Sequence, residues 1–426
     1  MKEKAFNLFD LGLKKAGQVR LFDNNAFDDD GNLIDFETQV AIVSHYLQTK
    51  GTKNSKPFRD KAPKFIKLWN EWVKGKSQDF YLDGSIVSEP SALDTYLFND
   101  IFNPPFKPVD KPKFTFIDLF AGIGGFRIAM QNLGGKCIFS SEWDTHAQKT
   151  YFANYGEMPF GDITRESTKQ YIPDHFDVLC AGFPCQAFSI AGYRRGFEDT
   201  RGTLFFDIAE ILRRKRPKAF FLENVKNLKS HDNGRTYEVI MNTLESLGYM
   251  ASSKVMNSMD YANIPQNRER IFIVGFDPER VPNWRSFDFP DKIKLTKNIH
   301  DCIDYSITDE TLFYRENHRY YPTLKSDMIN PDTIYQWRRK YVRENQSNVC
   351  PTLTANMGEG GHNVPLILTT NGIRKLSPKE CLNFQGYPDN FMFPNSLARS
   401  SMYKQAGNSV TVPLIQRVAN NIINTL

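Results

Sequence analysis

An apolar strand, a glycine-rich turn and a helix follow one another over residues 114–133, and this order constrains the fold more than any other stretch. Residues 114–120 are predicted to form a buried strand, because apolar side chains dominate them. The turn Ala121-Gly122-Ile123-Gly124-Gly125 then leads into a helical pattern. Glycines allow the backbone to approach a ligand closely at the N-terminus of a helix. The stretch therefore predicts the nucleotide-binding opening of an α/β sheet.

Two acidic residues and a tryptophan follow at positions suited to a nucleoside. The next predicted strand, residues 136–141, leads to Glu142 and Trp143. An acidic residue about 20 positions after such glycines can hydrogen-bond a ribose diol, and Trp143 offers a face for an adenine ring, although both could instead be structural. Asp162, in a later loop, could accept from the adenine amine. Because the turn lacks the full G-x-G-x-x-G of dinucleotide enzymes, the pattern favours S-adenosylmethionine over NAD.

A candidate nucleophile follows the third predicted strand, residues 176–181, in the sequence Gly182-Phe183-Pro184-Cys185. Pro184 fixes its own φ and pushes Phe183 toward an extended conformation. Cys185 would thus stand on a stiff turn at the carboxyl end of a strand, where ligands bind in open α/β sheets. The alternative is an ordinary buried cysteine.

Three further stretches are predicted to border the same sheet edge. Residues 192–202 resemble a mobile lid, or an ordinary surface loop, with arginines that would contact phosphates: Arg194, Arg195 and Arg201. The predicted strand 219–222 delivers Glu223, which either caps the next helix or does acid–base work. Arg268 and Arg270 lead into an apolar strand, which is costly unless they pair or point into a site.

Composition excludes some classes of protein and leaves others open. The net charge of +5 permits a polyanionic partner without requiring one. The six cysteines form no C-x-x-C pair and the seven histidines have no ligand spacing beside them, so neither zinc nor a disulfide framework is expected. No apolar signal core and no stretch of membrane-spanning length is present in the sequence. We therefore expect a soluble protein of a reducing compartment.

Residues 1–110 differ from the rest of the chain. Residues 36–47 and 65–73 have apolar side chains at helical spacing, so a mostly helical extension is predicted. A proline-rich stretch at residues 103–112 reads as a semi-rigid linker. No chemistry is predicted for this extension.

Taken in order, the motifs resemble those of the cytosine-C5 DNA methyltransferases of bacterial restriction–modification systems. The resemblance runs from about residue 114 to the carboxyl terminus and rests on an ordered set of motifs. They are residues 118–126, Glu142-Trp143, Asp162, Phe183-Pro184-Cys185-Gln186, Glu223-Asn224-Val225, Gln266-Asn267-Arg268-Glu269-Arg270, residues 374–381 and Gln405-Ala406-Gly407-Asn408-Ser409-Val410.

The resemblance implies a doubly wound, mostly parallel sheet of the Rossmann-like type. It implies a cofactor-binding and catalytic domain at 111–280, a smaller target-recognition domain at 281–372, and a carboxyl-terminal segment, 373–426, that returns and completes the cofactor pocket. The cofactor would be S-adenosylmethionine, with no metal. The residues implied to bind it are Phe120, Gly122, Gly124, Gly125, Glu142, Trp143, Asp162, Ile163, Asn408 and Ser409.

The resemblance also implies a mechanism on a cytosine flipped out of the duplex. Cys185 would add to C6 as a thiolate, which makes C5 nucleophilic. Glu223 would hydrogen-bond N3 and the exocyclic amine. Arg270 would bind O2, and Arg268 would favour the thiolate through its positive field.

Duplex DNA is the expected partner. The residues predicted to contact it are Gln186, Ser189, Arg194, Arg195, Arg201, Arg338, Arg339, Arg343, Thr352 and Leu353. The recognition segment is similar to those of enzymes that modify GGNCC-type or GGWCC-type sites. A monomer in the bacterial cytoplasm, paired with a restriction endonuclease, is expected. The alternatives are an RNA cytosine methyltransferase on the same scaffold, a catalytically silent relative and a nicotinamide-dependent oxidoreductase.

Overall fold

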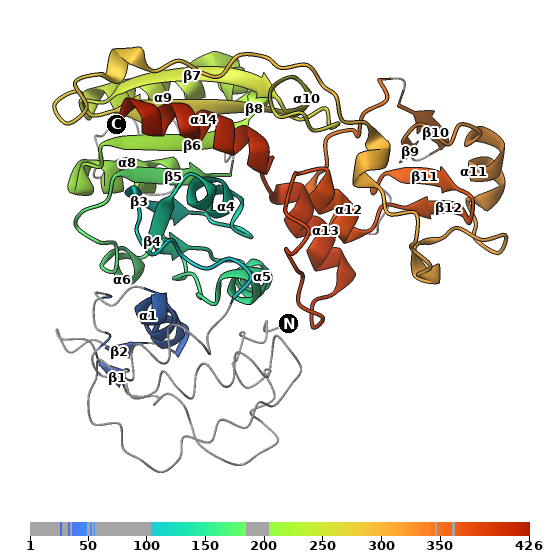
Figure 1. The fold of residues 1–426 in the computed structure, drawn as a ribbon, viewed down its shortest axis with the longest axis horizontal. Coiled ribbons are helices and arrows are strands. Elements are labelled where there is room, and N and C mark those ends of the chain that lie inside the picture. The colour runs from blue at the N-terminus through green and yellow to red at the C-terminus, as the bar shows by residue number, and fades with distance from the viewer. Residues whose placement is uncertain are drawn as a thin grey trace, which may run out of the picture.

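The computed structural model describes residues 104–184 and 204–426, apart from 339, 346 and 360–362. In the amino-terminal part it describes Thr52, Ser55, helix α1 (Phe36–Gln48) and the short strands β1 (Ala26–Phe27) and β2 (Leu33–Ile34). A large body built around a six-stranded sheet lies beside a smaller body with its own sheet (Figure 1).

The large sheet has the strand order β4-β3-β5-β6-β8-β7. β3 pairs in parallel with β4 and β5, and β5 pairs in parallel with β6, whereas β8 runs antiparallel to both β6 and β7. The prediction of a doubly wound, mostly parallel sheet is therefore confirmed. The bounds are β3 Phe114–Leu119, β4 Gly135–Ser141, β5 Val178–Gly182, β6 Ala219–Val225, β7 Met250–Asn257 and β8 Glu269–Phe276.

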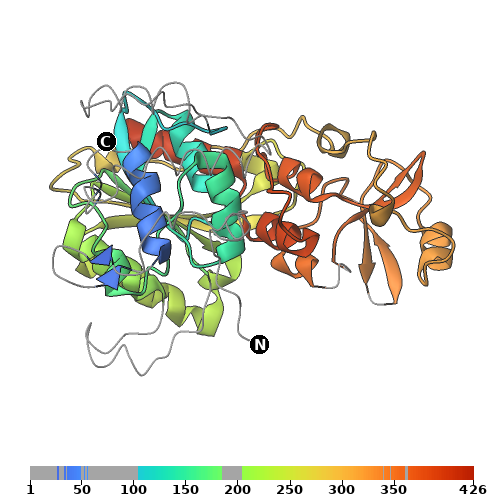
Figure 2. The same cartoon turned by 90° about the horizontal axis from the view of Figure 1, so that it is seen from below.

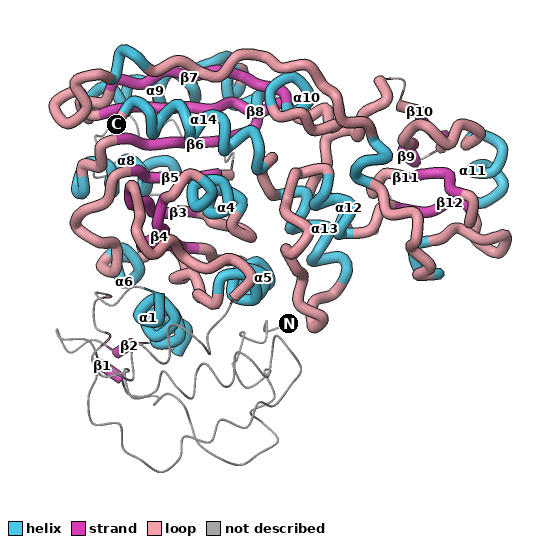
Figure 3. Tube along the Cα trace, in the orientation of Figure 1, coloured by secondary structure: helices cyan, strands magenta, loops and turns pink. Residues whose placement is uncertain are grey.

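Helices cover both faces of this sheet, because alternate residues of its central strands point to opposite sides (Figure 3). Phe116, Cys180 and Phe221 join one core, and Ile117, Leu179 and Phe220 join the other. The helices of this body are α4 Gly125–Asn132, α5 Thr145–Tyr155, α6 Glu166–Lys169, α8 Leu204–Lys215, α9 Arg235–Ser246, α10 Ser258–Tyr261 and α14 Val412–Thr425.

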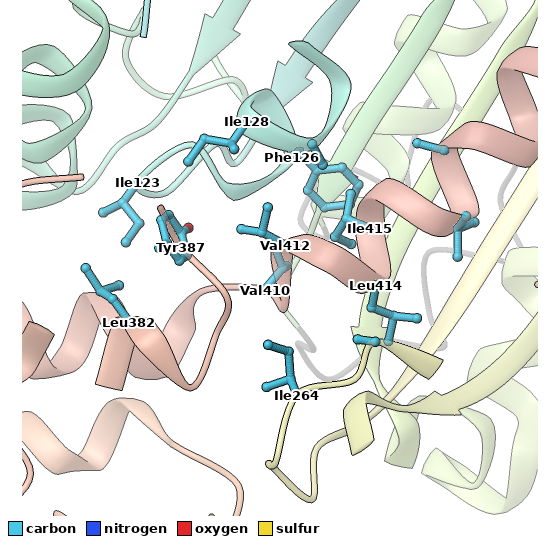
Figure 4. Packing of buried hydrophobic residues seen from close by; sticks show 14 of the residues in the cluster. Ile123, Phe126, Ile128, Ile264, Leu382, Tyr387, Val410, Val412, Leu414 and Ile415 are labelled. Atoms are coloured by element: carbon cyan, nitrogen blue, oxygen red, sulfur yellow. The ribbon is translucent and has the colours of Figure 1, made fainter. Parts of the chain in front are cut away.

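The last helix, α14, returns the chain to the large body and packs against α4. Figure 4 shows Phe126 of α4 beside Ile415 of α14, with Val410 and Val412 close to Tyr387. All five side chains belong to the first core. The carboxyl-terminal segment thus covers the helix that begins at the glycine turn.

The small body holds a four-stranded antiparallel sheet in the order β10-β9-β11-β12. It has its own apolar core, and the Tyr320 ring stacks on Trp337 with centroids 4.4 Å apart. Its elements, with the two helices that join it to the large body, are α11 Tyr321–Asp327, β9 Tyr335–Arg338, β10 Tyr341–Glu344, β11 Leu366–Thr369, β12 Gly372–Lys375, α12 Pro378–Asn383 and α13 Arg399–Asn408.

Short 3₁₀ helices connect the larger elements. They span Lys226–Lys229, His231–Gly234, Trp284–Ser286, Ile299–Cys302, Glu310–Leu312 and Ala355–Gly358. No helix in the described part of the chain is long and apolar enough to cross a membrane.

Helix α1, predicted from its apolar spacing, lies over the large body (Figure 2) and contributes to its second core. His45 of α1 lies 3.0 Å from Glu157, which Arg127 of α4 also contacts at 2.9 Å. All three side chains are buried. Burial raises the pKa of Glu157, but Arg127 and His45 outweigh burial and hold this pKa at about 2.

We predict that Glu157→Gln lowers the free energy of unfolding by about 3 kcal/mol at pH 7, because it leaves the buried guanidinium of Arg127 without its carboxylate. The folded pKa of about 2 lies below the ordinary value of 4.5, so the stabilisation is present above pH 4.5 and is lost as the pH falls toward 2. Urea unfolding at pH 7, 4 and 3 should show the deficit of the variant shrinking as the pH falls below 4.5. A deficit that is independent of pH would contradict this assignment.

Candidate active site

The carboxyl ends of β3, β4, β5 and β6 border a cavity of about 750 Å³. This size suits a ligand of nucleoside dimensions or larger. Every predicted cofactor residue except Gly124 lines the cavity, and so do Glu223, Arg268 and Arg270. The carboxyl-terminal segment supplies one wall through Lys404, Gln405, Gly407, Asn408, Ser409 and Val410.

The three glycines of the turn have different physical roles. Gly122 has a φ of +55°, and a Cβ built on it would meet nothing within 4 Å. A Cβ on Gly124, with a φ of +84°, would lie 2.4 Å from the ring of Tyr155. On Gly125 it would lie 2.6 Å from Val410. Close approach to a ligand therefore fits Gly122. Packing requires glycine at positions 124 and 125, and Gly124 does not line the cavity.

Glu142 ties the end of β4 to the glycine turn. Its carboxylate accepts from the backbone N–H of Gly122 at 2.7 Å and from that of Asp144 at 2.8 Å. Burial raises the pKa of Glu142, and these two N–H groups oppose the shift. A carboxylate has about four lone-pair sites, so it can still accept from a ligand hydroxyl. Trp143 beside it is 73% exposed, which leaves its indole face open to a ligand.

Asp162 and Ile163 lie in the third loop of the cavity. The carboxylate of Asp162 accepts from the backbone N–H and the hydroxyl of Thr164, at 3.0 and 2.9 Å. The loop is fixed to the sheet by Phe160, which accepts from the backbone N–H of Glu142 at 2.9 Å. The acidic residues predicted from spacing therefore lie on adjacent walls of one cavity.

Glu223 and Arg270 meet on the other side of the cavity. Because β8 is antiparallel to β6, the start of β8 lies beside the end of β6, and Arg270 pairs in register with Val225. The Nε atom of Arg270 lies 3.0 Å from Glu223 Oε1. Gly182, at the end of β5, pairs with Glu223. The predicted catalytic carboxyl group thus has a cationic partner and faces the strand that leads to Cys185.

Several predicted residues lie outside the described part of the chain: Cys185, Gln186, Ser189, Arg194, Arg195, Arg201 and Arg339. Pro184, which precedes Cys185, is described and lines the cavity. Asn224 holds this turn, because its side-chain amide donates to the carbonyl of Phe183 at 2.9 Å. Sequence reasoning did not assign this role to Asn224. The sequence signal that could have indicated this role is the position of Asn224 directly after Glu223, at the end of an apolar strand.

Arg268 is buried and joins three segments rather than standing free in the cavity. Its guanidinium donates to the carbonyls of Leu353, at 2.8 Å, and Gly407, at 3.2 Å, and also to that of Ser409. The side chain of Leu353, which was predicted to contact DNA, packs in the core at 1% exposure. The hydroxyl of neighbouring Thr352 donates to the carbonyl of Asn267 at 2.6 Å.

Asn408 and Ser409 complete the wall formed by the carboxyl-terminal segment. The hydroxyl of Ser409 shares a hydrogen bond with that of Tyr387. Lys404 pairs with Asp144 at 2.9 Å and so fixes α13 to the β4 side of the cavity. Tyr387 and Lys404 were not identified from the sequence, because their partners are more than 20 residues away in the chain.

The described arginines predicted to contact DNA lie in the small body. Arg338 and Arg343 are exposed on the β9–β10 hairpin, and Tyr341, 56% exposed, pairs with Arg338. Arg343 donates to Gln336 on the same face of the hairpin. These exposed groups can meet a partner's phosphates or base edges.

Residues 114–424 match the family of C-5 cytosine-specific DNA methylases. The chain belongs to this family. It is a DNA cytosine-5-methyltransferase, and the family implies the use of S-adenosylmethionine. This methylase assignment decides against the RNA-modifying, silent and nicotinamide-dependent alternatives.

Relatives of this methylase include three type II methyltransferases. M.Bsp6I of Bacillus sp. (strain RFL6) is 51% identical over 312 residues, which cover 72% of this chain and 98% of that protein. M.HpaII of Haemophilus parainfluenzae is 48% identical over 81% of this chain and 98% of its own. M.HhaI of Haemophilus parahaemolyticus is 43% identical over 73% of this chain and 94% of its own.

Solved structures share the fold of this methylase. Dnmt2 methyltransferase of S. pombe superposes with a TM-score of 0.55 at 16% identity, covering 73% of this chain and 98% of that one. The methyltransferase EhMeth of Entamoeba histolytica gives a TM-score of 0.54 at 18% identity, covering 73% of this chain and 98% of that one.

We predict that Gly124→Ala destabilises the methylase more than Gly122→Ala does. Both place a side chain at positive φ, which costs about 1 kcal/mol. Gly124→Ala adds a clash with Tyr155 that should bring its loss to about 3 kcal/mol. Urea unfolding of the two variants makes the comparison, and equal losses would show that packing does not separate the two glycines.

Proposed function

We propose that the cavity binds S-adenosylmethionine on its Glu142 and Asp162 side and an extruded cytosine on its Glu223 and Arg270 side. The observation that carries the proposal is that both sets of residues line one cavity. The turn that leads to Cys185 enters this cavity between them through Gly182, Phe183 and Pro184. Methyl transfer requires the two reactants to be held in contact and aligned, which a shared cavity provides.

The residues on the cofactor side suit the parts of S-adenosylmethionine. Phe120 and Trp143 offer aromatic faces to the adenine, and Glu142 and Asp162 offer acceptors for the ribose hydroxyls and the adenine amine. Asn408 and Ser409 would close over the methionine portion. When bound, the cofactor supplies a sulfonium methyl group to a carbon nucleophile. Gly122, with open space where a Cβ would stand, leaves room for the ligand beside the backbone.

On the cytosine side, the thiolate of Cys185 would form a bond to C6 and make C5 electron-rich. After methylation, the C5 proton leaves to a base, the C5–C6 double bond re-forms and Cys185 departs as a thiolate. Glu223 would accept from the exocyclic amine with one oxygen and share a proton with N3. Arg270, held by Glu223 at 3.0 Å, would direct its remaining N–H groups to O2.

Arg268 would assist by its positive charge on the cavity wall, which favours a nearby thiolate. Its hydrogen bonds to three backbone carbonyls support a second role, which is to keep the recognition segment and the carboxyl-terminal wall in register with the catalytic strands. Both roles require the Arg268 guanidinium to stay at this position in the cavity wall.

The small body would recognise the DNA target, corresponding to the recognition domain at residues 281–372. The exposed arginines of the β9–β10 hairpin support phosphate and guanine contacts. The target sequence stays a prediction of the GGNCC or GGWCC type. The protein would act as a monomer. Its cellular role would be to protect DNA from a cognate restriction endonuclease.

We predict that Cys185→Ser lowers turnover by about a thousandfold or more, because a hydroxyl is a far poorer nucleophile than a thiolate. Its affinity for S-adenosylmethionine should stay within about twofold of the parent. Cys180→Ala is the matched control, since Cys180 is fully buried on β5 and outside the cavity. Wild-type protein should also form a covalent adduct with duplex DNA that carries 5-fluorocytosine at the target. Near-normal turnover by Cys185→Ser would refute the mechanism.

We predict that bisulfite sequencing of DNA from cells that express the protein will show methylcytosine at one short sequence of the GGNCC or GGWCC type. DNA from cells that express Cys185→Ser is the control and should show none. Methylation confined to a different short sequence would overturn the predicted target and leave the chemistry intact.

A further inference from the structure

Helix α1 lies outside the family match yet forms part of the core of the large body. The match begins at residue 114, and α1 spans Phe36–Gln48. Every residue from 39 to 47 is buried, including the polar Gln39, Ser44 and His45. Polar groups are buried when they have partners. Gln39 donates to the carbonyl of nearby Ile34, whereas the contacts of Ser44 and His45 indicate what the helix is attached to.

Ser44 and His45 contact one short segment, residues 157–160. The hydroxyl of Ser44 accepts from the backbone N–H of Met158 at 2.9 Å. The Nε2 atom of His45 lies 3.0 Å from a carboxylate oxygen of Glu157, and the His45 ring lies 4.6 Å from that of Phe160. Nδ1 of His45 donates to the carbonyl of Ala41 at 2.8 Å, which fixes the ring so that Nε2 faces Glu157.

This segment continues directly into the cavity. Phe160 is bonded to β4 on both sides, through the carbonyl of Ser140 and the N–H of Glu142, each at 2.9 Å. The next residues, Gly161, Asp162 and Ile163, line the cavity. Glu157 also forms an ion pair with Arg127 of α4, the helix that begins at the glycine turn. A shift of α1 would therefore be transmitted to two walls of the cavity.

We infer that α1 is a positioning element for the cofactor, in which Ser44 and His45 set the place of the loop at residues 161–163. The two residues touch no ligand and act through Glu157, Met158 and Phe160. The inference rests on the proposed placement of S-adenosylmethionine at Asp162. It assigns a role in the reaction to an extension that the methylase family match does not include.

The test measures S-adenosylmethionine binding by calorimetry and steady-state kinetics on the full chain. His45→Ala and Ser44→Ala should each raise the Kd and the KM for S-adenosylmethionine about tenfold, equivalent to about 1.4 kcal/mol. The kcat at saturating cofactor and the KM for DNA should stay within about twofold. His45→Gln, which keeps a side-chain N–H for Glu157, should recover most of the affinity.

Val43→Ala is the matched control, because it trims a fully buried side chain of the same helix and keeps both polar contacts. It should lower the melting temperature and leave the Kd unchanged. If His45→Ala does not fold, the smaller change Ser44→Ala carries the test. Unchanged Kd in the folded variants, or an equal weakening in Val43→Ala, would overturn the inference.

Asp162→Ala separates this inference from the proposed site. If Asp162→Ala binds S-adenosylmethionine normally, the proposed placement of the cofactor fails. If it binds weakly while Ser44→Ala and His45→Ala bind normally, the cofactor placement stands and only the role of α1 is refuted.

Discussion

The cavity depends on one buried cation, Arg268, which stands where three parts of the chain meet. Its guanidinium binds carbonyls of the segment that follows the small body's hairpin, at Leu353, and of the carboxyl-terminal segment, at Gly407 and Ser409. Burying an unpaired guanidinium would be prohibitive, and the carbonyl dipoles offset that cost only while all three segments stay in place. Gly407 is part of the same junction, because a Cβ there would lie 2.2 Å from the backbone of Thr354. The junction is therefore tight at the backbone level.

The loops around the cavity are held by side-chain hydrogen bonds and an ion pair that are formed without a ligand. Glu142 holds Gly122, Asn224 holds Phe183, and Lys404 holds Asp144. The groups that are left open, such as the face of Trp143 and the space at Gly122, point to where a ligand can enter. Dipoles and charges fixed before a substrate binds need no reorganisation during the reaction, which is the physical basis of preorganised catalysis.

Much of this arrangement follows from local patterns in the sequence. Apolar runs predict β3, β5, β6 and β8, and the position of Glu142 after the glycines predicts its place at the cavity, because strand ends in a parallel sheet meet at one edge. Other features depend on contacts between distant residues. The need for glycine at position 124 comes from Tyr155 on α5, and the burial of Leu353 comes from the junction at Arg268. No local pattern contains either partner.

Helix α1 shows the same limit more sharply. Its apolar spacing predicts a helix, but the two polar residues that give it a function, Ser44 and His45, look like ordinary surface positions until the structure buries them against residues 157–160. A buried carboxylate is costly unless it is paired, and Glu157 is contacted both by His45 and by Arg127 of the helix that begins at the glycine turn. Because the same carboxylate contacts an element inside the family match and one outside it, α1 cannot be treated as an independent appendage. Its energetic contribution is made within the core of the catalytic domain, next to the loops that line the cavity.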